Sequence, residues 1–180
     1  MQTNLMGTCR IVEETLQKEK QRKKSIRFIH ISTDGVYPST HGHYKETDPT
    51  IPYNNYGWTK LGAECAVHML KNFCIIRTRF FDPQNIPFKT HAVDSYSSSI
   101  SLNDLAKAIH TLVYADFIGT VNIGGERKSD YTRYKKFKPS TKPCLLKHIL
   151  NTVPFALSRD ASLDCALWKK IANKSYHAAL

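Results

Sequence analysis

Two side chains able to move a proton lie four residues apart in the segment Tyr56-Gly-Trp-Thr-Lys60. On a helix, residues at this spacing share a face, with their Cβ atoms about 5–6 Å apart. An ammonium group beside a phenol favours the phenolate and lowers the phenol pKa from about 10. The pair therefore predicts a tyrosine that passes protons in either direction. The same spacing is also found where an exposed tyrosine and a solvated lysine do no chemistry.

A third polar side chain, Thr33, directly follows the apolar segment 26–32. That segment is short and rich in β-branched and aromatic residues, which predicts a buried strand. Ligands of parallel α/β sheets bind at the carboxyl ends of strands. A Thr33 hydroxyl at that position can donate a hydrogen bond to a substrate carbonyl oxygen while Tyr56 protonates it. Together with Lys60, these residues suit the reduction of a ketone by hydride, or the reverse oxidation.

The elements that must position these residues follow from the apolar spacing. Helical periodicity predicts helices over 3–20 and 56–71, and a β-rich run predicts a strand over 73–81. The expected buried face of the second helix carries Leu61, Cys65 and Met69. Strand, loop, helix and strand in this order form a βαβ crossover. We therefore expect a parallel sheet and an α/β fold.

Further elements are predicted beyond an expected loop at 82–99. Ser101 and Asp104 have the spacing of a helix N-cap pair. The helix after them is expected to bury Leu105, Ile109, Leu112 and Val113. A short strand is predicted over 119–125 and a last helix over 162–172.

The net charge of +11 comes from 26 lysines and arginines against 15 acidic residues. Such a surface attracts nucleic acid, membrane phosphates or small anionic substrates. One basic run, 18–24, falls where a helix dipole favours cations. The other comprises Arg133, Lys135, Lys136 and Lys138. Aromatic residues alternate with cations there, as in some nucleic-acid binders. No nucleic-acid-binding module motif is present, however, so we rank nucleic acid as the most remote partner.

The remaining composition excludes several classes of protein. A helix that spans a membrane needs about 18–20 consecutive apolar residues, and no apolar run here is that long. The first residues also lack the pattern of a secretory signal. Five cysteines without a C-x-x-C pair are typical of reduced thiols, so we expect a cytoplasmic protein. His41 and His43 lack a third ligand at metal spacing, and we expect no metal site.

The chain is similar to the extended short-chain dehydrogenase/reductase family, and within it to the nucleotide-sugar 4-keto reductases. The segments that carry the resemblance are Phe28-Ile-His-Ile-Ser-Thr-Asp-Gly-Val-Tyr37, Tyr44-Lys-Glu46, Tyr56-Gly-Trp-Thr-Lys-Leu-Gly-Ala-Glu64 and Arg77-Thr-Arg79. The likeness implies an NAD- or NADP-dependent enzyme acting on a nucleotide-diphosphate sugar. It implies a partial doubly wound, Rossmann-like parallel sheet over residues 1–125, with residues 126–180 as a substrate-region and helical segment of the same unit.

The resemblance also implies roles for individual residues. Thr33 would orient the carbonyl, Tyr56 would donate the proton, and Lys60 would bind the nicotinamide ribose. The implied catalytic residues are Thr33, Tyr56, Lys60, Asn4 and Asp34, and the implied cofactor-binding residues are Ser32, Tyr56 and Lys60. Arg127, in the region where the family binds substrate, is the implied substrate-binding residue. Related 4,6-dehydratases carry a glutamate where this chain has Gly35, which disfavours dehydration and leaves reduction or epimerisation.

One family feature is missing from the sequence. Members open with a strand and a G-x-x-G-x-x-G turn that holds the cofactor pyrophosphate. None of the eight glycines here has that spacing. We therefore expect the C-terminal portion of the family fold, an open edge on the strand at 26–32, and weak or no binding of NAD(P)H by the chain alone. A separate N-terminal half or a full-length homologue could complete it. The alternative is an inactive relative that serves as a binding or regulatory subunit.

Overall fold

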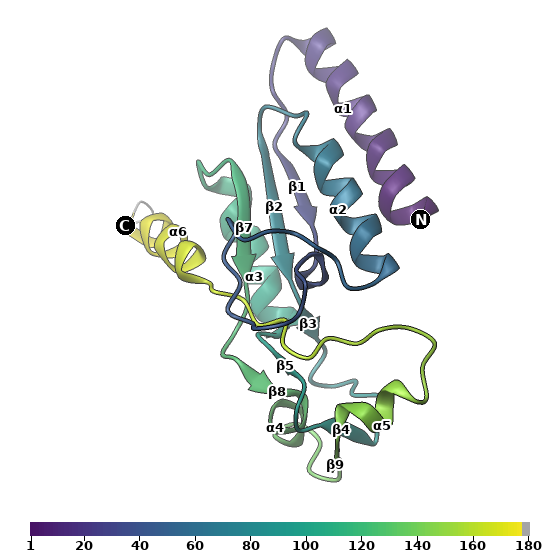
Figure 1. Cartoon of the computed structure of the whole chain (residues 1–180). Coiled ribbons are helices and arrows are strands. Elements are labelled where there is room, and N and C mark those ends of the chain that lie inside the picture. The colour runs from purple at the N-terminus through teal and green to yellow at the C-terminus, as the bar shows by residue number, and fades with distance from the viewer. Residues whose placement is uncertain (178–180) are drawn as a thin grey trace.

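The computed structural model describes residues 1–177 and contains a three-stranded parallel sheet with helices on both faces (Figure 1). The sheet has the strand order β1-β2-β7, and its strands are Phe28–Ile31, Phe73–Thr78 and Gly119–Ile123. Helices α1 and α2, Thr8–Arg22 and Asn55–Val67, cover one face. Helix α3, Leu102–Tyr114, covers the other. The expected α/β fold is thereby confirmed.

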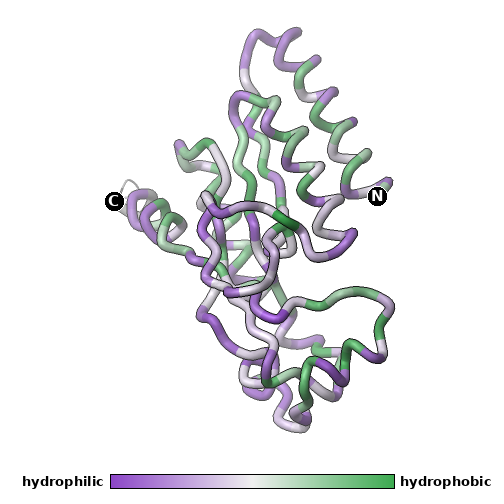
Figure 2. Tube along the Cα trace, in the orientation of Figure 1, coloured by the Kyte–Doolittle hydropathy of each residue, from purple (hydrophilic) through white to green (hydrophobic). Residues whose placement is uncertain are grey.

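The central strand β2 is buried along its whole length and divides the core in two. Ile75 packs with Val12 of α1 and Val67 of α2. Cys74 and Ile76 point to the opposite face and pack with the apolar side of α3. This alternation is the two-residue period of a strand, and both faces are apolar because helices cover both. Figure 2 shows the apolar residues gathered along these strands.

A second group of short elements lies beyond the carboxyl ends of the sheet strands (Figure 1). Its paired strands are β3 (Phe80–Phe81) with β6 (Ile100–Ser101), β4 (Thr90–Ala92) with β9 (Lys142–Cys144), and β5 (Tyr96–Ser97) with β8 (Lys128–Ser129). Its helices are α4 (Asp130–Lys135) and α5 (Leu146–Leu150). The chain then returns through α6 (Ala166–His177), which packs Leu167 and Trp168 against the α3 side of the sheet. The expected loop at 82–99 therefore contains two short strands.

The buried face of α2 differs from the expected one. Cys65 and Met69 are exposed, whereas Glu64 and Val67 are buried. The reason is a cation on the neighbouring strand: Arg77 of β2 pairs with Glu64, so a carboxylate occupies a position that faces the sheet. Apolar periodicity alone does not predict this, because it treats every acidic residue as solvent-facing.

The predicted start of α3 is confirmed, since the Ser101 hydroxyl accepts a hydrogen bond from the Asp104 N–H. Two other predictions about helices need correction. On α3, Val113 is exposed, and Ala108, which was not predicted to be buried, lies in the core. The last helix starts at Ala166, because the residues before it form isolated β-bridges, Asp160 with Tyr96 and Leu163 with Tyr44, and Ser162 between them is fully buried.

Strand β1 forms one edge of the sheet. Within the described residues it pairs with β2 alone, in parallel register from Phe28 opposite Phe73 to Ile31 opposite Ile76. Its other side therefore carries backbone groups with no strand partner. This agrees with the open edge expected from the sequence.

Candidate active site

The start of α2 sets the position of Tyr56. The Asn54 side chain caps this helix by accepting a hydrogen bond of 2.9 Å from the Gly57 N–H. A side chain at Gly57 would collide with the backbone oxygen of Gly35, which lies in a short 3₁₀ turn directly after β1. This close approach brings the first turn of α2, and Tyr56 with it, to the carboxyl end of β1.

Lys60 and Thr33 lie at the same end of β1. The Lys60 Nζ donates a hydrogen bond of 2.5 Å to the carbonyl oxygen of Ile31, the last residue of that strand. Thr33 is buried two residues further on, and its hydroxyl accepts from the Gly35 N–H and donates to Asp34. Burial lowers the pKa of Lys60, partly offset by Glu64. The structure thus gathers the three predicted residues at one end of the sheet.

The protonation of Tyr56 differs from the expectation. Burial raises the pKa of Tyr56 above its usual value of 10, and the nearby Asp34 and Tyr53 raise it further. The predicted lowering by Lys60 is wrong in this structure, because the Lys60 ammonium is directed to the Ile31 carbonyl. Tyr56 is 53% exposed. A protonated, accessible phenol at neutral pH is suited to donating a proton.

Asn4 reaches this helix from the N-terminal end of the chain. Residues Gln2–Gly7 form a π-helical turn, a geometry found frequently at functional sites. From this turn the Asn4 amide donates to the Thr59 hydroxyl at 3.2 Å, and that hydroxyl donates to the Tyr56 carbonyl at 2.7 Å. The predicted site residue Asn4 is therefore connected to Tyr56 through Thr59.

An open pocket of about 590 Å³ lies beside Tyr56. It is lined by Tyr53, Asn54, Asn55, Tyr56, Pro154, Phe155 and Ala156. The Asn54 amide also donates to the Ala156 carbonyl at 3.4 Å, so one side chain links the start of α2 to the opposite wall. A ligand in this pocket would therefore lie against Tyr56.

Ser32 is turned into the protein interior. Its hydroxyl donates to Glu64, whose carboxylate is paired with Arg77 at 2.7 Å. Arg77 in turn donates to the Tyr37 hydroxyl at 2.9 Å. Among the residues for which the sequence predicted no role, Glu64, Arg77 and Tyr37 form the polar layer behind the site. The feature of the sequence that could have indicated this layer is Glu64, which lies one helical turn after Lys60.

The two arginines of the later region are held by the protein itself. Arg127 donates to the Asp160 carboxylate at 2.7 and 2.9 Å and lies 4.0 Å from the centre of the Tyr96 ring. Arg133, which the sequence placed in a basic surface cluster, is buried and donates to the carbonyl oxygens of Ser97 and Ser99. Buried carbonyls need donors, so this part of the expected basic surface is structural.

Residues 1–177 contain neither a metal-binding cluster nor a membrane-spanning helix. No group of three or more histidine, cysteine or acidic side chains there could hold a metal ion. None of the helices described is long and apolar enough to cross a membrane. All five cysteines are free thiols in the structure.

His30 is a buried titratable group behind the site. It lies in β1, is 8% exposed, and its Nε2 has no hydrogen-bond partner among the described residues. Burial and the Lys60 charge lower its pKa from 6.5 to about 4, and Glu64 opposes them. Because the folded chain disfavours the charged imidazole, protonation favours the unfolded state.

We therefore expect His30 to make the folded chain less stable in acid. Its contribution is fully present above pH 6.5 and is lost as the pH falls toward 4, by up to about 3 kcal/mol. Urea unfolding at several pH values should show this loss in the parent and a shallower loss in His30→Phe. The same substitution at the exposed His110 of α3 is the control. Equal pH dependence in all three proteins would contradict the expectation.

A parallel sheet with a tyrosine and a lysine one helical turn apart at its carboxyl end resembles the extended short-chain dehydrogenase/reductases, the family that the sequence also resembles. Comparison with known proteins agrees that the chain is similar to this family. Within it, residues 1–88 match the model of the RmlD substrate binding domain.

Individual relatives fall in the same group. A hypothetical dTDP-4-dehydrorhamnose reductase from Sulfolobus tokodaii is 28% identical, with a TM-score of 0.76 over 93% of this chain and 64% of that one. The Bacillus anthracis dTDP-4-dehydrorhamnose reductase, solved with NADP, shares the fold at 17% identity and a TM-score of 0.76, over 97% of this chain and 72% of that one. A Neisseria gonorrhoeae dTDP-glucose 4,6-dehydratase is 25% identical over 159 residues, 71% of this chain. The chain spans 46% of that dehydratase.

Proposed function

We propose that this chain carries the catalytic part of an NAD(P)-dependent reductase of nucleotide-linked 4-keto-6-deoxy sugars. The observation that supports this most directly is the gathering of Thr33, Tyr56 and Lys60 at the carboxyl end of β1. In the proposed reaction the Thr33 hydroxyl orients the keto oxygen and Tyr56 transfers its proton to that oxygen. The product is the corresponding alcohol.

The residues at this site fit one end of a nicotinamide cofactor. One N–H of the Lys60 ammonium donates to the Ile31 carbonyl, and its other two N–H groups could donate to the ribose hydroxyls. When bound, the cofactor would supply the hydride. For the pyrophosphate end of the cofactor, the described residues offer no equivalent binding site. The glycine pair after β7, Gly124 and Gly125, packs against the Ser98 and Ser99 backbone. Ser32, whose hydroxyl binds Glu64, would contribute through its backbone.

The proposal is tested by turnover. The chain is assayed alone and as a fusion protein. In the fusion, the part of the Sulfolobus tokodaii protein that has no counterpart in this chain is joined in front of it. The substrate is a dTDP-linked 4-keto-6-deoxy sugar with NADPH or NADH, and the reading is the loss of reduced cofactor. We expect reduction by the fusion. A correctly folded fusion that binds both ligands without consuming cofactor would favour an inactive binding subunit.

Thr33 is expected to matter less than Tyr56. Thr33→Val keeps the shape of the side chain and removes one hydrogen bond, worth about 0.5–1.5 kcal/mol net. We therefore expect kcat to fall roughly 2- to 15-fold. Steady-state rates of the fusion measure this. Thr33→Ser keeps the hydroxyl and should retain most of the activity. A loss with Thr33→Ser as large as with Thr33→Val would show that packing, and not the hydroxyl, is the cause.

A further inference from the structure

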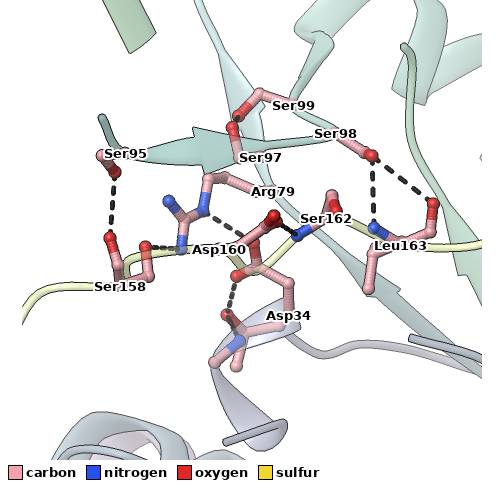
Figure 3. A network of polar contacts seen from close by, with 12 residues as sticks. Asp34, Arg79, Ser95, Ser97, Ser98, Ser99, Ser158, Asp160, Ser162 and Leu163 are labelled. Atoms are coloured by element: carbon pink, nitrogen blue, oxygen red, sulfur yellow. Dashed lines mark hydrogen bonds and ion pairs between the residues drawn. The ribbon is translucent and has the colours of Figure 1, made fainter. Parts of the chain in front are cut away.

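The Arg79 guanidinium connects three segments beside the site (Figure 3). It lies between β2 and β3, and its Nε is 2.7 Å from a carboxylate oxygen of Asp34. Its Nη2 donates to the Ser158 hydroxyl at 3.1 Å and to the Tyr53 hydroxyl at 3.4 Å. Ser158 is itself held through its carbonyl by the Ser95 hydroxyl at 2.9 Å. The guanidinium is therefore fixed in place.

Asp34 is the second group near Tyr56 that could hold a transferable proton. Its side chain is 2% exposed and directly follows Thr33 in the chain. The pKa of Asp34 lies above its ordinary value because burial outweighs the Arg79 cation and the hydrogen bonds from Thr33 and Gly35, which act to lower it. A buried carboxyl without a cation keeps its proton at neutral pH and can act as an acid. The Arg79 guanidinium, 2.7 Å from the carboxylate, is thus the group that favours the ionised form of Asp34 against the effect of burial.

The charged and titratable groups that act on Asp34 come from several elements. Arg79 is the cation in contact with it. Tyr56 in the first turn of α2 and Tyr53 just before that helix contribute phenols. Asp130 at the start of α4 also interacts with it electrostatically. Of these, Arg79 alone carries a positive charge.

We propose that Arg79 is a positioning residue that holds Asp34 as a carboxylate, so that Tyr56 is the proton donor of this site and Asp34 donates none. The inference rests on the proposed function and deepens it by separating reduction from elimination. Loss of water from a sugar breaks a C–O bond, and the departing hydroxyl needs a proton to leave as water. A carboxylate held by Arg79 has no proton to give. The negative charge of Asp34 instead opposes ionisation of Tyr56 and keeps the phenol protonated.

The first test reads the protonation of Asp34 directly, in the fusion protein without substrate. Infrared spectra at neutral pH are compared between each protein and its Asp34→Asn version, so that the difference isolates this carboxyl. We expect no protonated-carboxyl band from Asp34 in the parent or in Arg79→Lys, which keeps the charge. We expect the band to appear in Arg79→Gln, which removes it. An Asp34 band in the parent, or none in a folded Arg79→Gln, would overturn the proposal.

The second test reads Tyr56 and remains informative if Arg79→Gln does not fold. The absorbance of phenolate is measured against pH in the parent and in Asp34→Asn. The curve of the same protein with Tyr56→Phe is subtracted from each, so that the difference reports Tyr56 alone. Removing a carboxylate and leaving the Arg79 cation unpaired should lower the Tyr56 pKa by about one unit or more. If Asp34 were already neutral, the substitution would leave the Tyr56 pKa in place, and the proposal would be wrong. Neither reading depends on turnover, so failure here and failure of the reductase assay are distinguishable.

Discussion

Replacing Tyr56 by phenylalanine is expected to lower kcat for ketone reduction by about 100- to 10,000-fold in the fusion protein. The substitution removes only the phenolic oxygen, and the ring keeps its place in the first turn of α2. The pKa of Tyr56 is raised by burial and by Asp34, so the parent holds the proton that the reaction consumes. The measurement is the steady-state rate at saturating substrate and cofactor.

A matched control uses the same change at Tyr114, a tyrosine of α3 that is 77% exposed. Tyr114→Phe should leave the rate unaltered. Circular dichroism checks that both variants are folded. Near-parental turnover by a folded Tyr56→Phe variant would show that another group donates the proton, and the proposed mechanism would then be wrong.

Replacing Arg77 by methionine is expected to lower the free energy of unfolding by about 3–5 kcal/mol. Arg77 is 6% exposed, and its guanidinium makes three hydrogen bonds to the Glu64 carboxylate. Methionine leaves that carboxylate buried without a cation. It also removes the donor to Tyr37, which holds the loop after Thr33. Urea unfolding at neutral pH measures the loss.

Two comparisons separate the ion pair from the packing of the arginine side chain. Changing Glu64 to leucine as well removes the unpaired charge, so the double variant should recover part of the stability. Lys107→Met on α3 breaks an exposed pair with Asp104 and should have little effect. If Arg77→Met were as stable as Lys107→Met, the Arg77–Glu64 pair would not be what holds α2 against the sheet.

Much of the local structure could be predicted from residue types. The strand before Thr33, the crossover to the next strand and the Ser101 cap agree with the expected pattern, although individual ends shift by several residues. These features depend on neighbours within one or two turns, where spacing and turn chemistry are informative. The same is true of the Tyr56 and Lys60 pair, since a single helical turn brings them to one face.

The charges and pKa values at the site were decided by the tertiary structure. Spacing predicted that Lys60 lowers the Tyr56 pKa, yet Lys60 binds the β1 carbonyl and Asp34 acts on Tyr56 instead. Arg77 and Arg79 each find a buried carboxylate on another segment, a contact that no sequence window contains. By itself the sequence determined the fold class and the reactive groups, because apolar periodicity and helical spacing are local. The charges around those groups depend on which distant side chains share the same buried volume, and only folding settles that.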